Sequence, residues 1–325
     1  MFDQSPFPDS APPAPVSDPS AASLGVIVPT RDRPERLARC LDALAAAREQ
    51  ISFTAYVCDS SGVEHASTVA ELCARHPFVR LVRHDRIGAS AARNVGTAAA
   101  SEELIVAVDD DVYVEPDAIR ALLDAYDSGE GMSVVAGAVE WTHWTSAPLT
   151  MRRIGHGRDA TAAEEPEFLV SALLLYPRRL AVELPWNERL WPYDDRYVTL
   201  LWRAAGARLG FAPAARARHD VKHSHYPVAH EADRIYVNLL DALLIERGPL
   251  RALSFEFLGF AACAKRWRNS PADLFGLIRA WARGHRALVR DRRRLREMVG
   301  RARGLRSMAA KAPCAEPASA AAKTT

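Results

Sequence analysis

The sequence predicts an α/β fold in which a mainly parallel sheet is flanked by helices. In the first half of the chain, short apolar runs alternate with helical segments at the spacing of βαβ units. The run at 104–108 is apolar throughout, as expected of a strand buried on both faces. Several of these runs end in polar residues, which right-handed crossovers bring to one edge of a parallel sheet. Open α/β sheets bind their ligands at that edge.

The elements of the first half are expected in a regular order. A buried strand at 24–29 is stopped by Pro29, and the next helix begins near Asp32 and Glu35, which have the spacing of a capping box. Strands are then expected at 51–58, 79–82 and 104–108, with helices at 63–75 and 88–100 between them.

The second half is less regular. Strands are expected at 132–140, 168–176 and 208–211, and a helix at 195–205 with Gly206 just beyond its end. A histidine-rich loop follows at 219–230, and the chain is expected to be helical from 232 to 306.

Length and composition limit the class of protein and the number of domains. The 325 residues are 49% hydrophobic and 25% charged with a net charge of +2, which is ordinary for a globular protein with one large core or two smaller ones. The five cysteines have no metal or disulfide spacing, which favours a reducing cytoplasm. No window approaches the ~18 apolar residues of a membrane span.

We expect disordered tails at 1–22 and 308–325, an α/β domain at 23–230 and a basic helical region at 231–307.

Three adjacent carboxylates, Asp109 to Asp111, follow the apolar run at 104–108. Carboxylates packed together raise one another's pKa unless a cation neutralises them. Their hard oxygen atoms suit Mg²⁺ or Mn²⁺, and such ions also hold phosphate oxygens. The sequence therefore predicts a metal–diphosphate site, and the alternative is an acidic, solvated turn.

The motifs across residues 24–250 resemble those of the family 2 glycosyltransferases, which are inverting enzymes with a GT-A nucleotide-diphospho-sugar-binding fold. Asp194 and Asp195, eleven residues before Gly206, stand where the family has a Glu-Asp catalytic pair. His219, six residues after Pro213, stands where many members complete their metal site. The other matching segments are 26–33 with Leu37, Cys40, Leu41 and Leu44, then Asp59-Ser60-Ser61, Gly88 with Arg93-Asn94-Val95-Gly96, and Asp109-Asp110-Asp111.

The resemblance implies a metal-dependent, inverting transfer of a sugar from a nucleotide-diphosphate donor to an acceptor hydroxyl on a glycan, a lipid-linked sugar or a small molecule. It implies Asp195 as the general base, supported by Asp194, and Asp111 as the direct ligand of Mg²⁺ or Mn²⁺, with Asp109 and His219 beside it. The residues that it assigns to donor binding are Pro29, Thr30, Arg33, Asp59, Arg93, Asp109 and Asp110.

Each assignment has a simpler alternative. Asp59 can cap the following helix, and Arg93 can be a surface arginine. The Asp194–Asp195 pair can serve the helix dipole alone, and Asp110 can be a solvated bystander. The histidines at 219–230 lack the spacing of a structural zinc site.

Two other function classes compete with glycosyl transfer. A nucleotidyltransferase would share the sheet and the acidic site, but the loop at 29–33 has no glycine for a phosphate loop. A non-catalytic sugar-nucleotide-binding protein would bind the donor without turnover, and the presence of a plausible base at Asp195 argues against it.

The C-terminal region is rich in arginine. Basic residues from Lys265 to Arg296 alternate with apolar ones, a pattern that suits the surface of anionic membranes. The alternative is a solvated helical face. No nucleic-acid recognition motif accompanies the basic residues, so no nucleic-acid partner is expected. We therefore expect a cytoplasmic protein with a peripheral contact at the inner face of the membrane.

Overall fold

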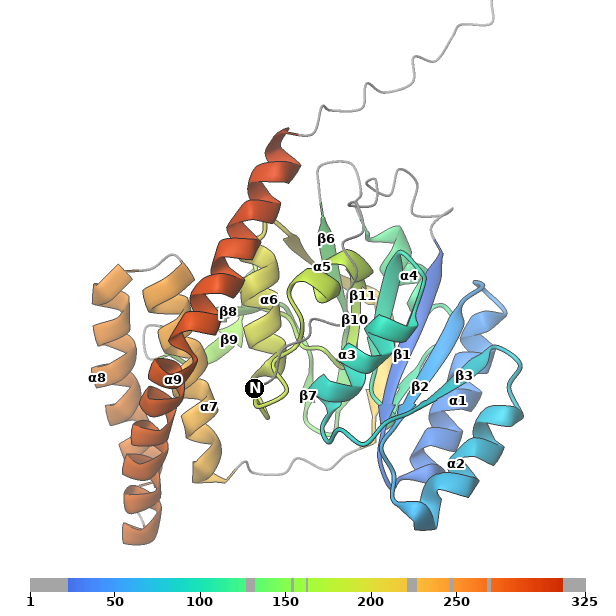
Figure 1. Cartoon of the computed structure of the whole chain (residues 1–325), viewed down its shortest axis with the longest axis horizontal. Coiled ribbons are helices and arrows are strands. Elements are labelled where there is room, and N and C mark those ends of the chain that lie inside the picture. Colours follow the sequence, from blue (N-terminus) through green and yellow to red (C-terminus); the bar gives the residue numbers. More distant parts are fainter. Residues whose placement is uncertain are drawn as a thin grey trace, which may run out of the picture.

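The computed structural model describes residues 23–126, 132–152, 155–161, 163–220, 227–245, 248–267 and 270–311. Its main sheet has nine strands in the order β3-β2-β1-β4-β10-β6-β11-β5, with β7 paired to β6 (Figure 1). The strands are β1 (Leu24–Thr30), β2 (Thr54–Asp59), β3 (Val79–Arg83), β4 (Leu104–Val108), β5 (Val112–Val114), β6 (Ser133–Trp141), β7 (Trp144–Thr145), β8 (Leu149–Met151), β9 (Gly157–Asp159), β10 (Leu173–Pro177) and β11 (Arg208–His219). The α-helices are α1 (Pro34–Arg48), α2 (Val63–Ala74), α3 (Ala89–Ala99), α4 (Ala118–Asp124), α5 (Arg178–Glu183), α6 (Asp194–Ala204), α7 (Glu231–Leu240), α8 (Gly248–Trp267) and α9 (Pro271–Lys311).

The first half confirms the predicted alternation of strands and helices. Strands β3, β2, β1 and β4 are parallel neighbours, joined by α1, α2 and α3. Side chains of β1 alternate between two cores: Ile27 faces the core shared with α3, α5 and α6, while Val26 and Val28 face the core shared with α1, α2 and α4. This burial on both faces explains why the strands read as continuous apolar runs.

The predicted capping box is wrong. Arg33 is the N-terminal capping residue of α1 and makes no side-chain cap. The Asp32 carboxylate instead accepts a hydrogen bond from the backbone N–H of Gly62 at 2.8 Å, and the Ser61 hydroxyl accepts one from the Asp32 N–H at 2.8 Å. Asp32 therefore joins the end of β1 to the loop after β2.

The strand expected at 168–176 is shorter than predicted. Strand β10 begins at Leu173 and is antiparallel to both β4 and β6. Phe168 forms an isolated bridge to Leu149, so the residues before β10 leave the main sheet toward the small β8–β9 hairpin.

The strand expected at 208–211 is longer than predicted, and this difference shapes the site. Strand β11 pairs in parallel with β6, shifts register between Ala212 and Arg216, and then pairs antiparallel with β5. In this second pairing His219 lies opposite Val112, one residue after the acidic triplet. Sheet pairing with both neighbours extends the strand through an alanine- and arginine-rich segment that lacks the β-branched residues typical of strands.

The helical prediction for 232–306 is confirmed by α7, a π-helical segment at Asp241–Ile245, α8 and α9. Helix α9 packs along α7 and α6 and continues to Lys311, beyond the expected start of the tail at 308. In Figure 1 these helices lie on the opposite side of the molecule from α1 and α2. The predicted tail at 1–22, and residues 312–325 of the tail predicted at 308–325, lie outside the described residues. Among the described helices, none has the length and apolar character needed to span a bilayer.

Candidate active site

The ends of three neighbouring strands meet at one edge of the sheet. Thr30 ends β1 beside Asp59 at the end of β2, and Asp109 follows β4. The Thr30 hydroxyl donates a hydrogen bond of 2.8 Å to Asp110, so the first and fourth strands are joined at their ends. Pro29 lies within β1 just before this contact. The predicted convergence of polar residues at this edge is therefore present.

Two arginines at the start of α1 pair with Asp110 and Asp111, two of the three carboxylates of the acidic triplet. Arg33 lies 3.1 Å from a carboxylate oxygen of Asp110 and 2.9 Å from one of Asp111, and Arg36 lies 3.2 Å from the same Asp111 oxygen. Desolvation raises the pKa of Asp110 to about 7, against the opposing effect of the Arg33 charge. Asp110 is fully buried, so the solvated-bystander alternative is wrong. Arg36 was not identified from the sequence, although its spacing of three residues from Arg33 puts both on one helical face.

His219 reaches Asp111 because β11 pairs with β5. Its Nε2 atom lies 3.6 Å from Asp111 Oδ1, and its ring stacks on Trp141 at a centroid distance of 5.0 Å. A cavity of about 860 Å³ opens beside this pair. It is lined by Arg36, Glu140, Trp141, Thr142, Arg218, His219 and Asp220.

Arg93 joins the two acidic motifs. Its guanidinium donates to Asp109 at 2.6 Å and to Asp194 at 3.0 Å, and it lies over the Trp186 ring at 4.7 Å. Arg93 is 2% exposed, which excludes the surface-arginine alternative. Asp109 therefore faces Arg93, whereas Asp111 faces His219.

The Asp194–Asp195 pair begins α6 against α3. Asp194 accepts hydrogen bonds from the Ser90 hydroxyl at 2.8 Å and from Arg93. Asp195 is partly buried and accepts a hydrogen bond from the Arg196 backbone N–H at 2.6 Å. Desolvation and the neighbouring Asp194 charge raise the pKa of Asp195 to about 7. A carboxylate with this pKa is suited to accept a proton near neutral pH.

Asp59 does not cap the following helix. The capping residue of α2 is Gly62, and Asp59 instead accepts a hydrogen bond from the Ser61 N–H at 2.8 Å and pairs with Arg83. Arg83 also donates to the Ser61 carbonyl at 2.9 Å. Sequence reasoning missed Arg83, because an arginine on a strand with alternating polarity looks like an ordinary surface residue.

The tryptophans of this region divide into core and surface. Trp186 is fully buried beneath Arg93, and Trp191 is 59% exposed immediately before the Asp194–Asp195 helix. Trp191 therefore lies at the surface beside the carboxylate pair, with its ring edge-to-face against His230 at a centroid distance of 4.7 Å.

Comparison with known proteins identifies the class. Residues 25–181 match the family model described as glycosyl transferase family 2. The chain therefore contains a family 2 glycosyltransferase domain and is a glycosyltransferase, as the sequence motifs indicated. The nucleotidyltransferase alternative is thereby disfavoured. No curated protein sequence matches the chain significantly.

Solved structures of low sequence identity share the GT-A fold. The mannosyltransferase PcManGT from Pyrobaculum calidifontis, in complex with GDP-Man and Mn²⁺, is 18% identical with a TM-score of 0.51, and the alignment covers 90% of this chain and 89% of that one. TarS 1-349 from S. aureus, in complex with UDP-GlcNAc, is 14% identical with a TM-score of 0.56, over 88% and 90% of the two chains. GalNAc-T7 with UDP, GalNAc and Mn²⁺ is 14% identical with a TM-score of 0.52, over 73% and 55%. At these identities the likeness establishes the fold alone.

Proposed function

We propose that this glycosyltransferase moves a sugar from a nucleoside-diphosphate donor to an acceptor hydroxyl, with inversion and with the help of Mg²⁺ or Mn²⁺. The observation that carries the proposal is the position of Arg93 between Asp109 and Asp194. Through this one buried side chain, the metal–donor motif and the candidate base pair belong to a single site. A donor held at the strand ends would then present its anomeric carbon to an acceptor near α6.

The donor set of Asp111 and His219 fits a divalent ion. The 3.6 Å between Asp111 Oδ1 and His219 Nε2 suits two donors on one ion, and a carboxylate with an imidazole is an acceptable set for Mn²⁺. When bound, such an ion supplies Lewis acidity toward the diphosphate. Arg33 and Arg36 already compensate Asp111, and both side chains are more than a third exposed. We infer that Arg33 and Arg36 release Asp111 and contact the donor phosphates when Asp111 binds the ion.

The remaining donor contacts follow from the strand ends. Asp59 has further lone pairs for a nucleobase N–H beside its contacts with Ser61 and Arg83. Asp109 is placed to accept hydrogen bonds from ribose or sugar hydroxyls in addition to Arg93, and its role as a third metal ligand is part of the same proposal. Pro29 and Thr30 form the floor of this site next to Asp110.

The acid–base assignment rests on the different environments of the two carboxylates of α6. Asp194 accepts hydrogen bonds from Ser90 and Arg93, and we assign it a supporting role that positions the groups around it. The pKa of Asp195, raised by desolvation, favours it as the group that takes the acceptor hydroxyl proton during in-line attack. The neighbouring structures carry GDP-Man or UDP-GlcNAc, which supports a nucleotide-sugar donor without selecting the base or the sugar.

We expect nucleoside-diphosphate binding to require a divalent cation and the Asp111 carboxylate. A thermal-shift screen of UDP, GDP and dTDP sugars with Mn²⁺ selects the donor, and donor hydrolysis confirms it. Calorimetric titration with Mn²⁺ or with EDTA should then show strong binding only with the ion, and Asp111→Asn should lose that dependence. Asp124→Asn, an exposed carboxylate at the end of α4, is the matched control. Equal affinity under all of these conditions would refute the metal assignment.

We also propose a peripheral membrane contact through α8 and α9, in a protein that works in the cytoplasm. Large apolar side chains are exposed on both helices, among them Leu250 at 82%, Phe257 at 72% and Phe275 at 66%. Arg279 and Arg283, which follow Phe275 by four and eight residues on α9, are exposed as well. Exposed apolar groups with neighbouring cations match the interface of an anionic bilayer.

Flotation with liposomes tests this contact. Binding should increase with the fraction of anionic lipid and weaken at high salt, because surface charge is screened within about 10 Å at 0.1 M. Phe257→Ser with Phe275→Ser should reduce binding, whereas Val63→Ser, at an even more exposed apolar residue on α2, should not. If the protein stays in the soluble fraction with every lipid, the basic region is only a solvated face.

A further inference from the structure

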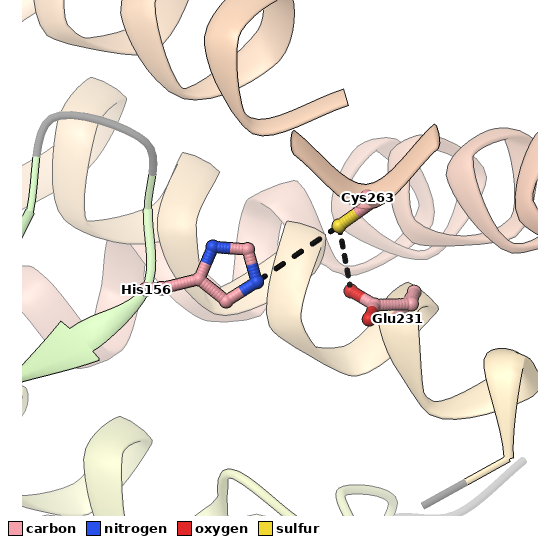
Figure 2. Close-up of side chains that lie close together, drawn as sticks. All are labelled: His156, Glu231 and Cys263. Atoms are coloured by element: carbon pink, nitrogen blue, oxygen red, sulfur yellow. Dashed lines mark hydrogen bonds between the residues drawn. The ribbon is translucent and has the colours of Figure 1, made fainter. Parts of the chain in front are cut away.

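Three potential metal ligands from three separate elements meet outside the candidate active site. His156 precedes β9, Glu231 is the first residue of α7, and Cys263 lies in α8 (Figure 2). One ligand atom from each lies within 4.8 Å of the other two, and within the described residues this is the only such group of three. The side chains point toward one another from the β8–β9 hairpin and the two helices.

The spacing matches the ligand shell of one tetrahedral ion. Cys263 Sγ lies 3.9 Å from His156 Nε2 and 3.4 Å from Glu231 Oε2. A zinc ion with bonds of about 2.3 Å to sulfur and about 2.0–2.1 Å to nitrogen or oxygen separates such donor atoms by roughly 3.5 Å. The two distances from the Cys263 sulfur therefore require shifts of only a few tenths of an ångström. The His156 and Glu231 donor atoms lie within 4.8 Å of each other and would approach further around an ion.

The backbone around His156 is fixed against α7. Gly155 has a φ of +74°, and its carbonyl accepts hydrogen bonds from Arg234 at 3.4 Å and from the Asn238 side chain at 3.2 Å. A Cβ atom at this position would lie 2.3 Å from the Asn238 side-chain nitrogen. A glycine is thus needed here, and the result is a His156 ring held beside Cys263.

Arg234 sets the charge of the group. Its buried guanidinium donates to Glu231 at 2.5 Å and to the Cys263 sulfur at 2.9 Å. A cation in this position favours the thiolate, which is the form of cysteine that binds metals. An ionised Glu231 and Cys263 beside one arginine leave one net negative charge. Arg234 also orients both ligands, as outer-shell hydrogen-bond donors do in metal sites.

We propose that His156, Glu231 and Cys263 bind one Zn²⁺ ion, which fastens α7 and α8 to the β8–β9 hairpin. A set of one sulfur, one nitrogen and one oxygen selects zinc over Mg²⁺, which prefers oxygen ligands alone. The site is distinct from that of Asp111, whose donors are hard. Three protein ligands leave the fourth tetrahedral position to water. The ion would join two parts of the chain, because His156 comes from the α/β domain and Glu231 and Cys263 come from the helical region that follows it.

Cobalt substitution in the full chain tests the proposal. After chelator treatment, Co²⁺ titration should produce a thiolate-to-cobalt charge-transfer band that saturates at one ion per chain, and Zn²⁺ should bleach it. Zn²⁺ should also raise the melting temperature. Because only a cysteine ligand gives this band, ions bound at Asp111 do not contribute to it, and Asp111→Asn should leave it unchanged.

Variants locate the site. Cys263→Ser should abolish the band, and His156→Gln should weaken Co²⁺ affinity by at least about tenfold, as loss of even an outer-shell partner does. Cys73→Ser, which removes another buried thiol in α2, is the matched control and should keep the band. The proposal is overturned by a wild type without the band, or by a band that persists in Cys263→Ser. If Cys263→Ser does not fold, unchanged Co²⁺ affinity in His156→Gln, a partly exposed position, overturns it equally.

Discussion

Asp195→Asn should reduce glycosyl transfer by roughly 10²–10⁴-fold, the usual contribution of a general base, which corresponds to about 3–5 kcal/mol of activation free energy. Asparagine keeps the shape and the hydrogen-bonding reach of Asp195 but cannot take the acceptor proton. Donor affinity should be nearly unchanged, because the proposed donor contacts lie at the strand ends. Initial rates of transfer and calorimetric donor binding, measured on the same preparation, separate these two effects.

Asp194→Asn is the informative comparison. Asp194 is engaged by Ser90 and Arg93, so its loss should act mainly through the KM of the acceptor and reduce kcat less than Asp195→Asn. The opposite ranking would move the base to Asp194. Wild-type turnover in both variants would remove the carboxylate pair from the mechanism.

The pH profile gives a second measure of the same assignment. The pKa of Asp195 is raised to about 7 by desolvation and by the Asp194 charge, and a base acts only when deprotonated. Transfer should therefore be half-maximal near pH 7, level off above it and fall with decreasing pH below it, approaching tenfold per pH unit. The residual activity of Asp195→Asn should lack this transition, and a wild-type rate that stays constant down to pH 5 would contradict the assignment.

Arg93→Met should destabilise the protein by about 3–5 kcal/mol, the effect of removing one partner from a buried ion pair. Methionine fills much of the same space beside Trp186 but leaves Asp109 and Asp194 facing each other's charge without a cation. Denaturant unfolding measures the decrease in the free energy of unfolding. Arg93→Lys should recover part of that free energy, because lysine restores the positive charge but not the contact of one guanidinium with two carboxylates.

The matched control for Arg93 is Arg293→Met. Arg293 forms an exposed i,i+4 ion pair with Glu297 on α9, so its replacement should leave the unfolding midpoint unchanged. Equal midpoints for Arg93→Met and wild type would show that Arg93 does not hold the two acidic motifs together.

The early strands and the acidic triplet were predictable because their signals are local. Residues buried on both faces of a parallel sheet must be apolar, and the end of β4 at Asp109 is visible as an abrupt change from apolar to charged. The start of α6 at Asp194 and the helical region were visible for similar reasons. In each case the residue types and their spacing depend on neighbours close in the chain.

The partners of these residues were not predictable from the sequence. Strand β11 extends to His219 because β6 and β5 pair with it, and this pairing, which has no local signal, places the imidazole beside Asp111. Arg36 and Arg83 look like ordinary surface arginines until the fold sets them against Asp111 and Asp59.

The resemblance to family 2 glycosyltransferases, the parallel core of the sheet and the carboxylates at strand and helix ends could be predicted from the order of residues, because these features are local patterns. The contacts of Arg93 with Asp109 and Asp194, and the grouping of His156, Glu231 and Cys263, exist only in the folded chain. The cysteines have no metal-binding spacing along the chain, yet Cys263 lies 107 residues after His156 and within 4 Å of it. Such contacts arise from the packing of whole elements, and packing depends on the complete fold.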